Sequence, residues 1–229
     1  MKNGQIKAIV VIALIAFVVL TFSGVKLLNL AWIISPSVQE VKTEFTPVED
    51  TAKFPFGNML LVEQGGTVKI TCDLSQVGAD VTKTEAKLWC WNVPFDISRY
   101  KGRDWDAVKP KGSENSFEIW SIRQQDLANS LQGSILSATV DVSRHIAGEY
   151  EKFWATGYQS GVLPEGDYTL AWILLKPQPN GDSLVAGYAT CQMSLVDSVQ
   201  MWSILAFTPF IALTVAAVGG AALYGRRRK

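Results

Sequence analysis

The sequence predicts an all-β protein: an antiparallel β-sandwich of about seven to eight strands, held between two transmembrane α-helices. Two observations predict the sandwich. From Asn58 onward apolar residues recur at every second position, and glycine-rich or proline-rich turns separate the runs. A third observation predicts the helices, because an uncharged apolar stretch lies near each end of the chain. We therefore expect one extracytoplasmic domain with a membrane segment on either side.

The C-terminal stretch, residues 201–224, contains no charged residue and opens near Trp202. About twenty apolar residues span the hydrocarbon of a bilayer, so this stretch predicts a transmembrane helix with Trp202 at its outer interface. Residues 225–229 form the predicted cytoplasmic tail, whose anchoring side chains are Arg226, Arg227, Arg228 and Lys229. The four-residue spacing of Ala212, Ala216 and Gly220 indicates a candidate helix-packing face, with ordinary alanine-rich composition as the alternative.

At the other end, residues 1–7 form the predicted cytoplasmic N-terminus and contain Lys2 and Lys7. Residues 8–34 follow as a transmembrane helix with an interfacial extension that includes Trp32. A cleavable signal peptide is the alternative, but residues 21–24 offer only a weak cleavage site. Basic residues mark the cytoplasmic side of membrane segments, so we expect a two-pass membrane protein with both termini cytoplasmic.

The run Lys2-Asn3-Gly4-Gln5 before an apolar stretch resembles the processing site of archaeal pilin-like precursors. The resemblance covers only the N-terminal residues. The second membrane segment, near the C-terminus, departs from the pilin pattern. A pilin-like protein is therefore a minor alternative.

Charge is distributed unevenly along the chain, although the whole is formally neutral. All twenty-one acidic residues lie between Glu40 and Asp197, and seven of the twenty-one basic residues flank the apolar ends. The middle therefore carries fourteen basic against twenty-one acidic residues, a net charge of −7. Phosphate binding needs clustered lysine and arginine, so this acidic middle argues against a nucleic-acid partner.

Residues 35–57 look like a linker, because Pro36, Pro47 and Pro55 punctuate them and acidic residues keep them solvated. Apolar and polar residues alternate at Val41–Phe45, which indicates one edge strand. Residues 58–198 form the predicted sandwich, whose strands are expected at 58–63, 67–74, 85–91, 116–122, 134–142, 168–176 and 184–196. The turns at 64–66 and 177–182 predict hairpins, and helical spacing at 146–154 predicts one short helix.

This pattern resembles the immunoglobulin-like β-sandwich superfamily. The residues that carry the resemblance are Val62, Gly65, Val68, Ile70 and Cys72 in the first predicted hairpin, Trp89 and Trp91 in the next strand, and Gly166-Asp167-Tyr168-Thr169-Leu170, which enters the sixth predicted strand. The chain departs from the antibody pattern because the sixth predicted strand has no cysteine to pair with Cys72. The resemblance implies a fold and no particular function.

Strict antiparallel alternation, counted back from the last strand, places the loops 92–115 and 143–165 close to the membrane. The first of these loops supplies the candidate membrane-near contacts, which are Arg99, Tyr100, Lys101, Arg103 and Trp105. The alternative is that the aromatic residues fill the core while the charged residues are solvated.

The sequence contains no catalytic motif and no metal-binding motif that we recognise. A single histidine and the lack of a Cys-x-x-Cys pair argue against zinc and copper sites, and the alternating Asp104 and Asp106 are a weak calcium signal. Cys90 and Cys191 form the candidate disulfide, with buried free thiols as the alternative, because the sixth strand would separate them.

We therefore expect a non-catalytic protein without a cofactor. Its sandwich would act as a structural or interaction module in a cell-envelope or viral-membrane assembly. An accessory subunit of a membrane enzyme or transport complex is the alternative. The expected partners are the membrane and other membrane-protein subunits or further copies of this chain.

Overall fold

The computed structural model describes residues 37–54, 59–75, 77, 83–111, 116–146, 161–202 and 204–205. Most of these residues belong to one compact unit, Ala31–Asp197, whereas 198–202 and 204–205 belong to a second unit. The predicted membrane segments lie outside the described residues, apart from the first residues of the C-terminal one. Within the described part of the chain, no helix is long and apolar enough to cross a membrane.

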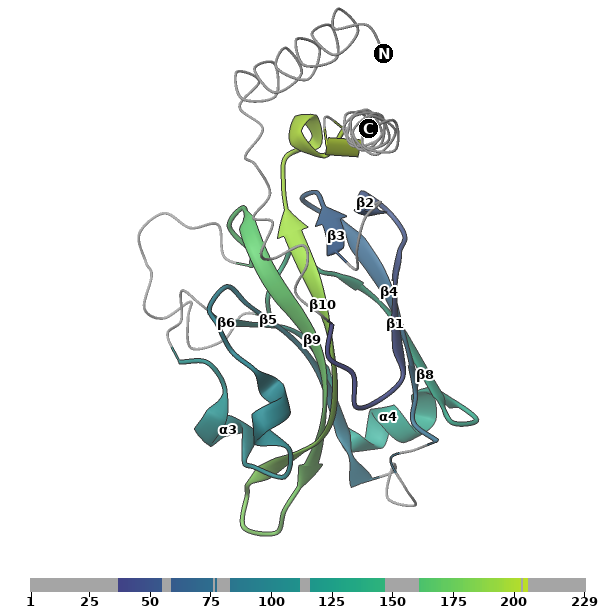
Figure 1. The fold of residues 1–229 in the computed structure, drawn as a ribbon. Coiled ribbons are helices and arrows are strands. Elements are labelled where there is room, and N and C mark those ends of the chain that lie inside the picture. The colour runs from purple at the N-terminus through teal and green to yellow at the C-terminus, as the bar shows by residue number, and fades with distance from the viewer. Residues whose placement is uncertain are drawn as a thin grey trace, which may run out of the picture. The chain divides into compact units, whose positions relative to one another are not determined.

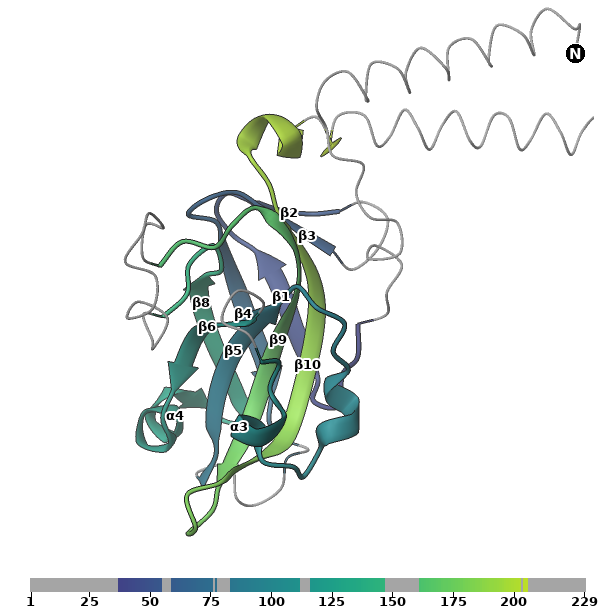
Figure 2. The same ribbon diagram turned by 90° about the vertical axis from the view of Figure 1, so that its left-hand side faces the viewer.

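Two β-sheets face each other, as predicted (Figures 1 and 2). One has the order β1-β4-β8-β7, and the other has the order β2-β3-β10-β9-β5-β6. The four-stranded sheet contains β1 (Thr43–Pro47), β4 (Thr67–Asp73), β7 (Leu131–Gln132) and β8 (Ile135–Asp141). The six-stranded sheet contains β2 (Thr51–Lys53), β3 (Met59–Val62), β5 (Glu85–Trp91), β6 (Ser116–Ile122), β9 (Gly166–Pro177) and β10 (Ser183–Leu195). The short helices named among the described residues of this unit are η2 (Ile97–Tyr100), α3 (Trp105–Val108) and α4 (Gln124–Ser130).

The main core lies between the sheets and is formed by alternate residues of their strands. On β4, Val68, Ile70 and Cys72 are buried, as the two-residue period predicted. Trp172 of β9 is fully buried, and its ring stacks on Trp120 of β6 with 5.4 Å between centroids. α4 adds Leu127 to this core and contacts β5 and β8, so it bridges the two sheets.

The sandwich has two distinct ends. We call the end at which β10 finishes the exit end, and the opposite end, formed by the β9–β10 turn at residues 178–182, the turn end. Pairing of Leu195 with Gly166 and of Trp91 with Thr169 places the start of β9 and the end of β5 at the exit end. β3 runs parallel to β10, and the other pairs are antiparallel. The strand directions agree with the alternation predicted from the sequence.

One edge of β10 is shared by three segments that lie far apart in the sequence. Near the turn end, Asp104 forms a β-bridge with Leu184. In the middle, the incoming segment (residues 37–41) runs antiparallel to β10 and bridges Ala189 through Gln39. Near the exit end, β3 pairs with residues 192–195. The other edge of β10 pairs with β9 along its length.

The described residues of this unit begin and end toward the same end of the sandwich. The amide of Thr190 donates to the Val38 carbonyl at 2.9 Å, and the amide of Glu40 donates to the Tyr188 carbonyl at 2.9 Å. Residue numbers therefore fall along the incoming segment as they rise along β10, so Ser37 lies on the exit-end side of this pairing. Asp197 follows β10 at the same end.

Residues 37–54 belong to the sandwich, which corrects the predicted linker at 35–57. Val41 and Phe45 lie in the main core, and the predicted edge strand is present as β1. β2 was not predicted. Glu49 and Asp50, which suggested a solvated linker, occupy the turn between β1 and β2. Acidic composition here marks a turn at the domain surface.

The turn at residues 64–66 connects the two sheets, so the hairpin predicted there is wrong. β3 pairs with β2 and β10, whereas β4 pairs with β1 and β8. Every residue of β3 is buried, as suits a strand covered on both faces, while β4 alternates. The crossing is tight: a Cβ atom on Gly66 would lie 2.7 Å from the Asp50 carbonyl oxygen. The hairpin predicted at 177–182 is confirmed as β9–β10.

The three cysteines are buried thiols outside any disulfide, so the candidate disulfide Cys90–Cys191 is not formed. Cys90 and Cys191 both pair with Leu170 of β9, one from each side. Their strands are therefore two inter-strand spacings apart, about 10 Å, which exceeds the reach of a disulfide. The helix predicted at 146–154 falls almost entirely outside the described residues.

Candidate functional site

The outer face of the six-stranded sheet, which points away from the four-stranded sheet, carries a second hydrophobic cluster. Trp89 and Trp91 alternate with the core residues of β5 and point to this face. They lie with Ile173 of β9 and Tyr188 of β10 in one buried cluster. Such a face needs a cover, which the chain supplies from the residues that follow β5.

The cover is the outer-face segment, residues 92–111, which includes η2 and α3. Its buried side chains Ile97 and Trp105 belong to the second hydrophobic cluster. The segment reaches the far edge of β10, where the amide of Gly102 donates to Val185 O at 2.8 Å and the amide of Val185 donates to Arg103 O at 2.9 Å. These two bonds extend the sheet by one short segment.

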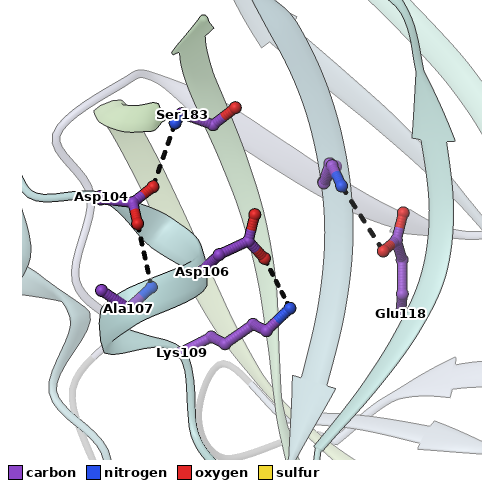
Figure 3. Close-up of polar contacts among 7 residues, drawn as sticks. Asp104, Asp106, Ala107, Lys109, Glu118 and Ser183 are labelled. Carbon is purple, nitrogen blue, oxygen red and sulfur yellow. Dashed lines mark hydrogen bonds and ion pairs between the residues drawn. The ribbon is translucent and has the colours of Figure 1, made fainter. Parts of the chain in front are cut away.

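Asp104 fixes the segment to the β9–β10 hairpin (Figure 3). One carboxylate oxygen accepts from the Ser183 amide at 3.0 Å, and the other accepts from the Ala107 amide at 3.2 Å, where Asp104 is the N-cap of α3. Next to it, Asp106 pairs with Lys109 at 2.6 Å. Lys109 also lies 5.4 Å from the ring centroid of Trp89. Both aspartates of the weak calcium signal are therefore engaged by protein donors.

Trp105 is 1% exposed, so it is a cover for the sheet and not a surface contact. Its ring meets Trp89 edge-on at 5.4 Å and lies 6.3 Å from Phe95. Phe95 in turn stacks on Tyr100 at 5.1 Å. For this part of the loop, the alternative to membrane contact therefore applies: the aromatic side chains fill a hydrophobic core.

Several charged residues of the segment form ion pairs. Arg99 lies 3.0 Å from Asp96, whose pKa is held below its ordinary value chiefly by the Ser98 hydroxyl, with a further contribution from Arg99. Lys101 pairs with Glu40 of the incoming segment. Burial raises the pKa of Tyr188 above its ordinary value, and the nearby charge of Glu40 adds to this effect.

The five candidate membrane-near residues lie beside the turn-end half of β10, away from the predicted position at the exit end. The two ends of the loop do lie at the exit end, next to Trp91 and Ser116, as strand counting predicted. The segment then turns back because the apolar outer face needs a cover. Sequence reasoning missed Glu40, Tyr188 and Ser183 as its partners, and only the capping character of Asp104 could have signalled one of these contacts.

The buried thiols are poorly suited to chemistry. Burial raises the pKa of Cys191 to about 12 and that of Cys90 well above its ordinary value, so neither forms a thiolate near neutral pH. Among the described residues, no group of three or more His, Cys, Asp and Glu side chains could hold a metal ion.

Most of the predicted anchor and helix-packing residues lie outside the described residues: Lys2, Lys7, Trp32, Ala212, Ala216, Gly220, Arg226, Arg227, Arg228 and Lys229. Trp202 is described and is 66% exposed in the helical residues that follow β10.

Comparison with known proteins adds little. No protein-family model matches the chain, and no curated protein matches it. Among solved structures, the chain is similar to the crystal structure of HiLPMO9B, with a TM-score of 0.32 and 13% sequence identity. The match covers 59% of this chain and 50% of that chain, so this chain spans half the length of its neighbour. A match at this level carries no argument about activity.

Proposed function

We propose that this chain is a non-catalytic, membrane-anchored interaction module. The sandwich is displayed on the extracytoplasmic side, and the apolar stretches at the two ends anchor it in one membrane. The partners are other membrane-protein subunits or further copies of this chain.

The observation that carries this proposal is that the first and last described residues of the sandwich lie toward the same end of it. Ser37 lies on the exit-end side of the pairing between the incoming segment and β10, and Asp197 follows β10 at that end, so the described residues of the sandwich begin and end toward the same end. This geometry suits a domain attached to a single membrane by both its ends. The opposite end carries the β9–β10 turn and is free to meet a partner.

The residues after β10 also support anchoring. Val199 is 72% exposed and Trp202 is 66% exposed. Large apolar side chains are costly to leave in water, and tryptophan favours the interface between membrane and water. Val199 lies just before the stretch predicted to span the membrane, residues 201–224, and Trp202 lies at the start of that stretch.

We propose further that the sandwich is immunoglobulin-like. Three features support this: the sheet orders correspond to an ABED sheet facing a CFG sheet with an added strand beside C, β3 pairs in parallel with the last strand, and Tyr168 donates from its hydroxyl to the Pro164 carbonyl at 2.8 Å. A tyrosine at the start of strand F that bonds to the backbone a few residues upstream is typical of that fold. Two residues further on, Leu170 replaces the usual cysteine.

Two measurements test the proposed function. The first is protease digestion of sealed right-side-out vesicles, with tags on both termini: protected tags and a digestible sandwich are expected, and a digested tag contradicts the topology. The second is the mass and composition of the complex purified in mild detergent. A homo-oligomer or a stoichiometric partner supports an interaction module, and a polytopic partner with a cofactor indicates the accessory subunit of an enzyme. A monomer without a partner contradicts the proposal.

A further inference from the structure

The turn between β9 and β10 carries an asparagine that is followed by glycine. Of the seven asparagines in the chain, Asn3 and Asn180 precede glycine, and Asn3 lies outside the described residues. Asn180 and Gly181 are exposed in the turn, which is the lowest loop in Figure 1. A Cβ atom on Gly181 would meet no described heavy atom within 4 Å, so this part of the backbone is open to water.

The side chain of Asn180 is held by Asp182. The amide of Asp182 donates to Oδ1 of Asn180 at 3.2 Å, and Nδ2 of Asn180 donates to the Asp182 carboxylate at 2.8 Å. Gly181 adopts a φ of 94°, a left-handed conformation that glycine reaches without strain. Its amide donates to the Gln178 carbonyl at 3.0 Å, and water can replace this bond because the turn is exposed.

These groups are the reactants of asparagine deamidation. The Gly181 nitrogen loses its proton to solvent base and bonds to Cγ of Asn180, so negative charge develops on Oδ1. The Asp182 amide already donates to Oδ1 and stabilises that charge. The bond from Cγ to Nδ2 then breaks, and Nδ2 takes up a proton and leaves as ammonia. Water opens the resulting five-membered imide at one carbonyl to give aspartate or at the other to give isoaspartate.

We propose that Asn180 is a site of spontaneous deamidation, and that the reaction loosens the hold of the β9–β10 hairpin on the outer-face segment. That hold includes the bond from the Ser183 amide to the Asp104 carboxylate, at 3.0 Å. Isoaspartate places an extra carbon in the backbone of the turn, shortly before Ser183. Both products also add a negative charge next to the Asp182 carboxylate.

Incubation of the full-length protein in detergent micelles at mildly alkaline pH tests the site. Peptide mass spectrometry measures the mass gained when a hydroxyl replaces the side-chain NH2, and an isoaspartate-specific methyltransferase labels the isoaspartate product. Asn180 should convert several times faster than Asn92 and Asn129, which are also exposed but precede valine and serine, whose side chains hinder attack by the amide. Conversion of Asn180 no faster than that of Asn92 and Asn129 overturns the proposal.

Two variants at position 182 test the contribution of the turn. Asp182→Pro removes the backbone N–H that donates to Oδ1 of Asn180, so it should slow the reaction several-fold. Asp182→Asn keeps this N–H and should react at close to the natural rate. Equal rates in the two variants would contradict the role of the Asp182 amide. The comparison of Asn180 with Asn92 and Asn129 needs no variant, so it decides the site even if Asp182→Pro fails to fold.

Hydrogen exchange at the Ser183 amide tests the consequence. The isolated isoaspartate product should exchange this amide faster than the unreacted protein does. Asn180→Asp carries the added charge on an ordinary backbone, so it separates the effect of charge from that of the longer backbone. Asn180→Gln forms no five-membered imide, so it should keep slow exchange after the same incubation. Unchanged exchange at Ser183 in the reacted protein contradicts the loosening. These results do not depend on the proposed function, since the reaction takes place within one turn of one chain.

Discussion

At the scale of single residues, burial in this sandwich separates side chains of the same type into different roles. Trp172 and Trp105 are 0% and 1% exposed and lie on opposite faces of the six-stranded sheet, whereas Trp202 is 66% exposed. The sequence shows only that all three are large and apolar. The continuous apolar run at residues 168–176 favours burial of Trp172 without showing its face, and no period could place Trp105, because it follows a loop.

Replacing Trp172 by alanine should lower the free energy of unfolding by about 3–5 kcal/mol, since it leaves a large cavity beside Trp120. Trp202→Ala is the matched control and should change the stability by less than about 0.5 kcal/mol. Thermal unfolding in detergent, followed by tryptophan fluorescence and circular dichroism, measures both. Equal melting temperatures for the two variants would contradict the assignment of Trp172 to the core.

Glu63 gives a pH-dependent prediction. Burial raises the pKa of this carboxyl above its ordinary value, and the negative charges of Asp50 and Asp197 raise it further. A raised pKa in the folded state means that the stabilisation is full below the pKa of the unfolded chain and is lost as the pH rises through the folded value. Glu63→Gln should therefore be more stable than the natural protein at neutral pH.

This advantage should shrink as the pH falls toward 4 and below, where the natural carboxyl is protonated too. Glu44→Gln, on the exposed side of β1, is the control and should show no such change. Melting temperatures across a pH series measure the effect. A constant difference between Glu63→Gln and the natural protein at all pH values would contradict the argument.

At the scale of elements, a short helix such as α3 determines how the loop that contains it packs on the larger strands. α3 is a four-residue helix, yet its N-cap Asp104 joins it to the β9–β10 hairpin. Asp104→Ala should lower the stability by about 0.5–2 kcal/mol, as for loss of other N-cap residues. Asp106→Ala, which removes only an exposed ion pair, should cost about 0–1 kcal/mol.

Hydrogen exchange gives the sharper test of Asp104. The amides of Ala107 and Ser183, which donate to this carboxylate, should exchange faster in Asp104→Ala than in Asp106→Ala. If the Ser183 amide exchanged equally fast in both variants, the carboxylate would not be what holds the hairpin to the segment.

The elements also show how far sequence alone could go. The predicted strands from residue 58 onward are all present, because either a two-residue period or an apolar run bounded by turn residues marks each of them. β2, β7 and α3 are too short to show a period, and α4 buries a single leucine. The partner of β3 could not be predicted, since a strand buried on both faces has no alternation to show which sheet it joins.

For the candidate site, the sequence located the loop but not its course. Strand counting placed both ends of the outer-face segment correctly, and alternation on β5 put Trp89 on the face opposite Leu88. The return of the segment toward Leu184 depends on which apolar surface of a folded sheet remains uncovered. That information exists only after the strands have paired.

At the scale of the whole molecule, the proposed topology predicts a role for the basic tail. Replacing Arg226, Arg227, Arg228 and Lys229 by glutamine should weaken the preference of the C-terminus for the cytoplasmic side. Protease added outside should then reach a C-terminal tag in part of the population. The control replaces Arg99, Lys101 and Arg103, which lie on the sandwich, and should leave the tag protected. Full protection in the tail variant would contradict the argument from charge.

The edge of β10 that three separate segments share also sets the order in which the sandwich can form. β10 is the last strand to be synthesised, and it pairs with β9, β3, the incoming segment and residues 102–104. Until it leaves the ribosome, three of these segments lack their edge partner, and the six-stranded sheet remains divided. Contacts this distant in sequence slow folding, because long loops must close first. The domain should therefore fold after its synthesis is complete, when the C-terminal apolar stretch is itself emerging.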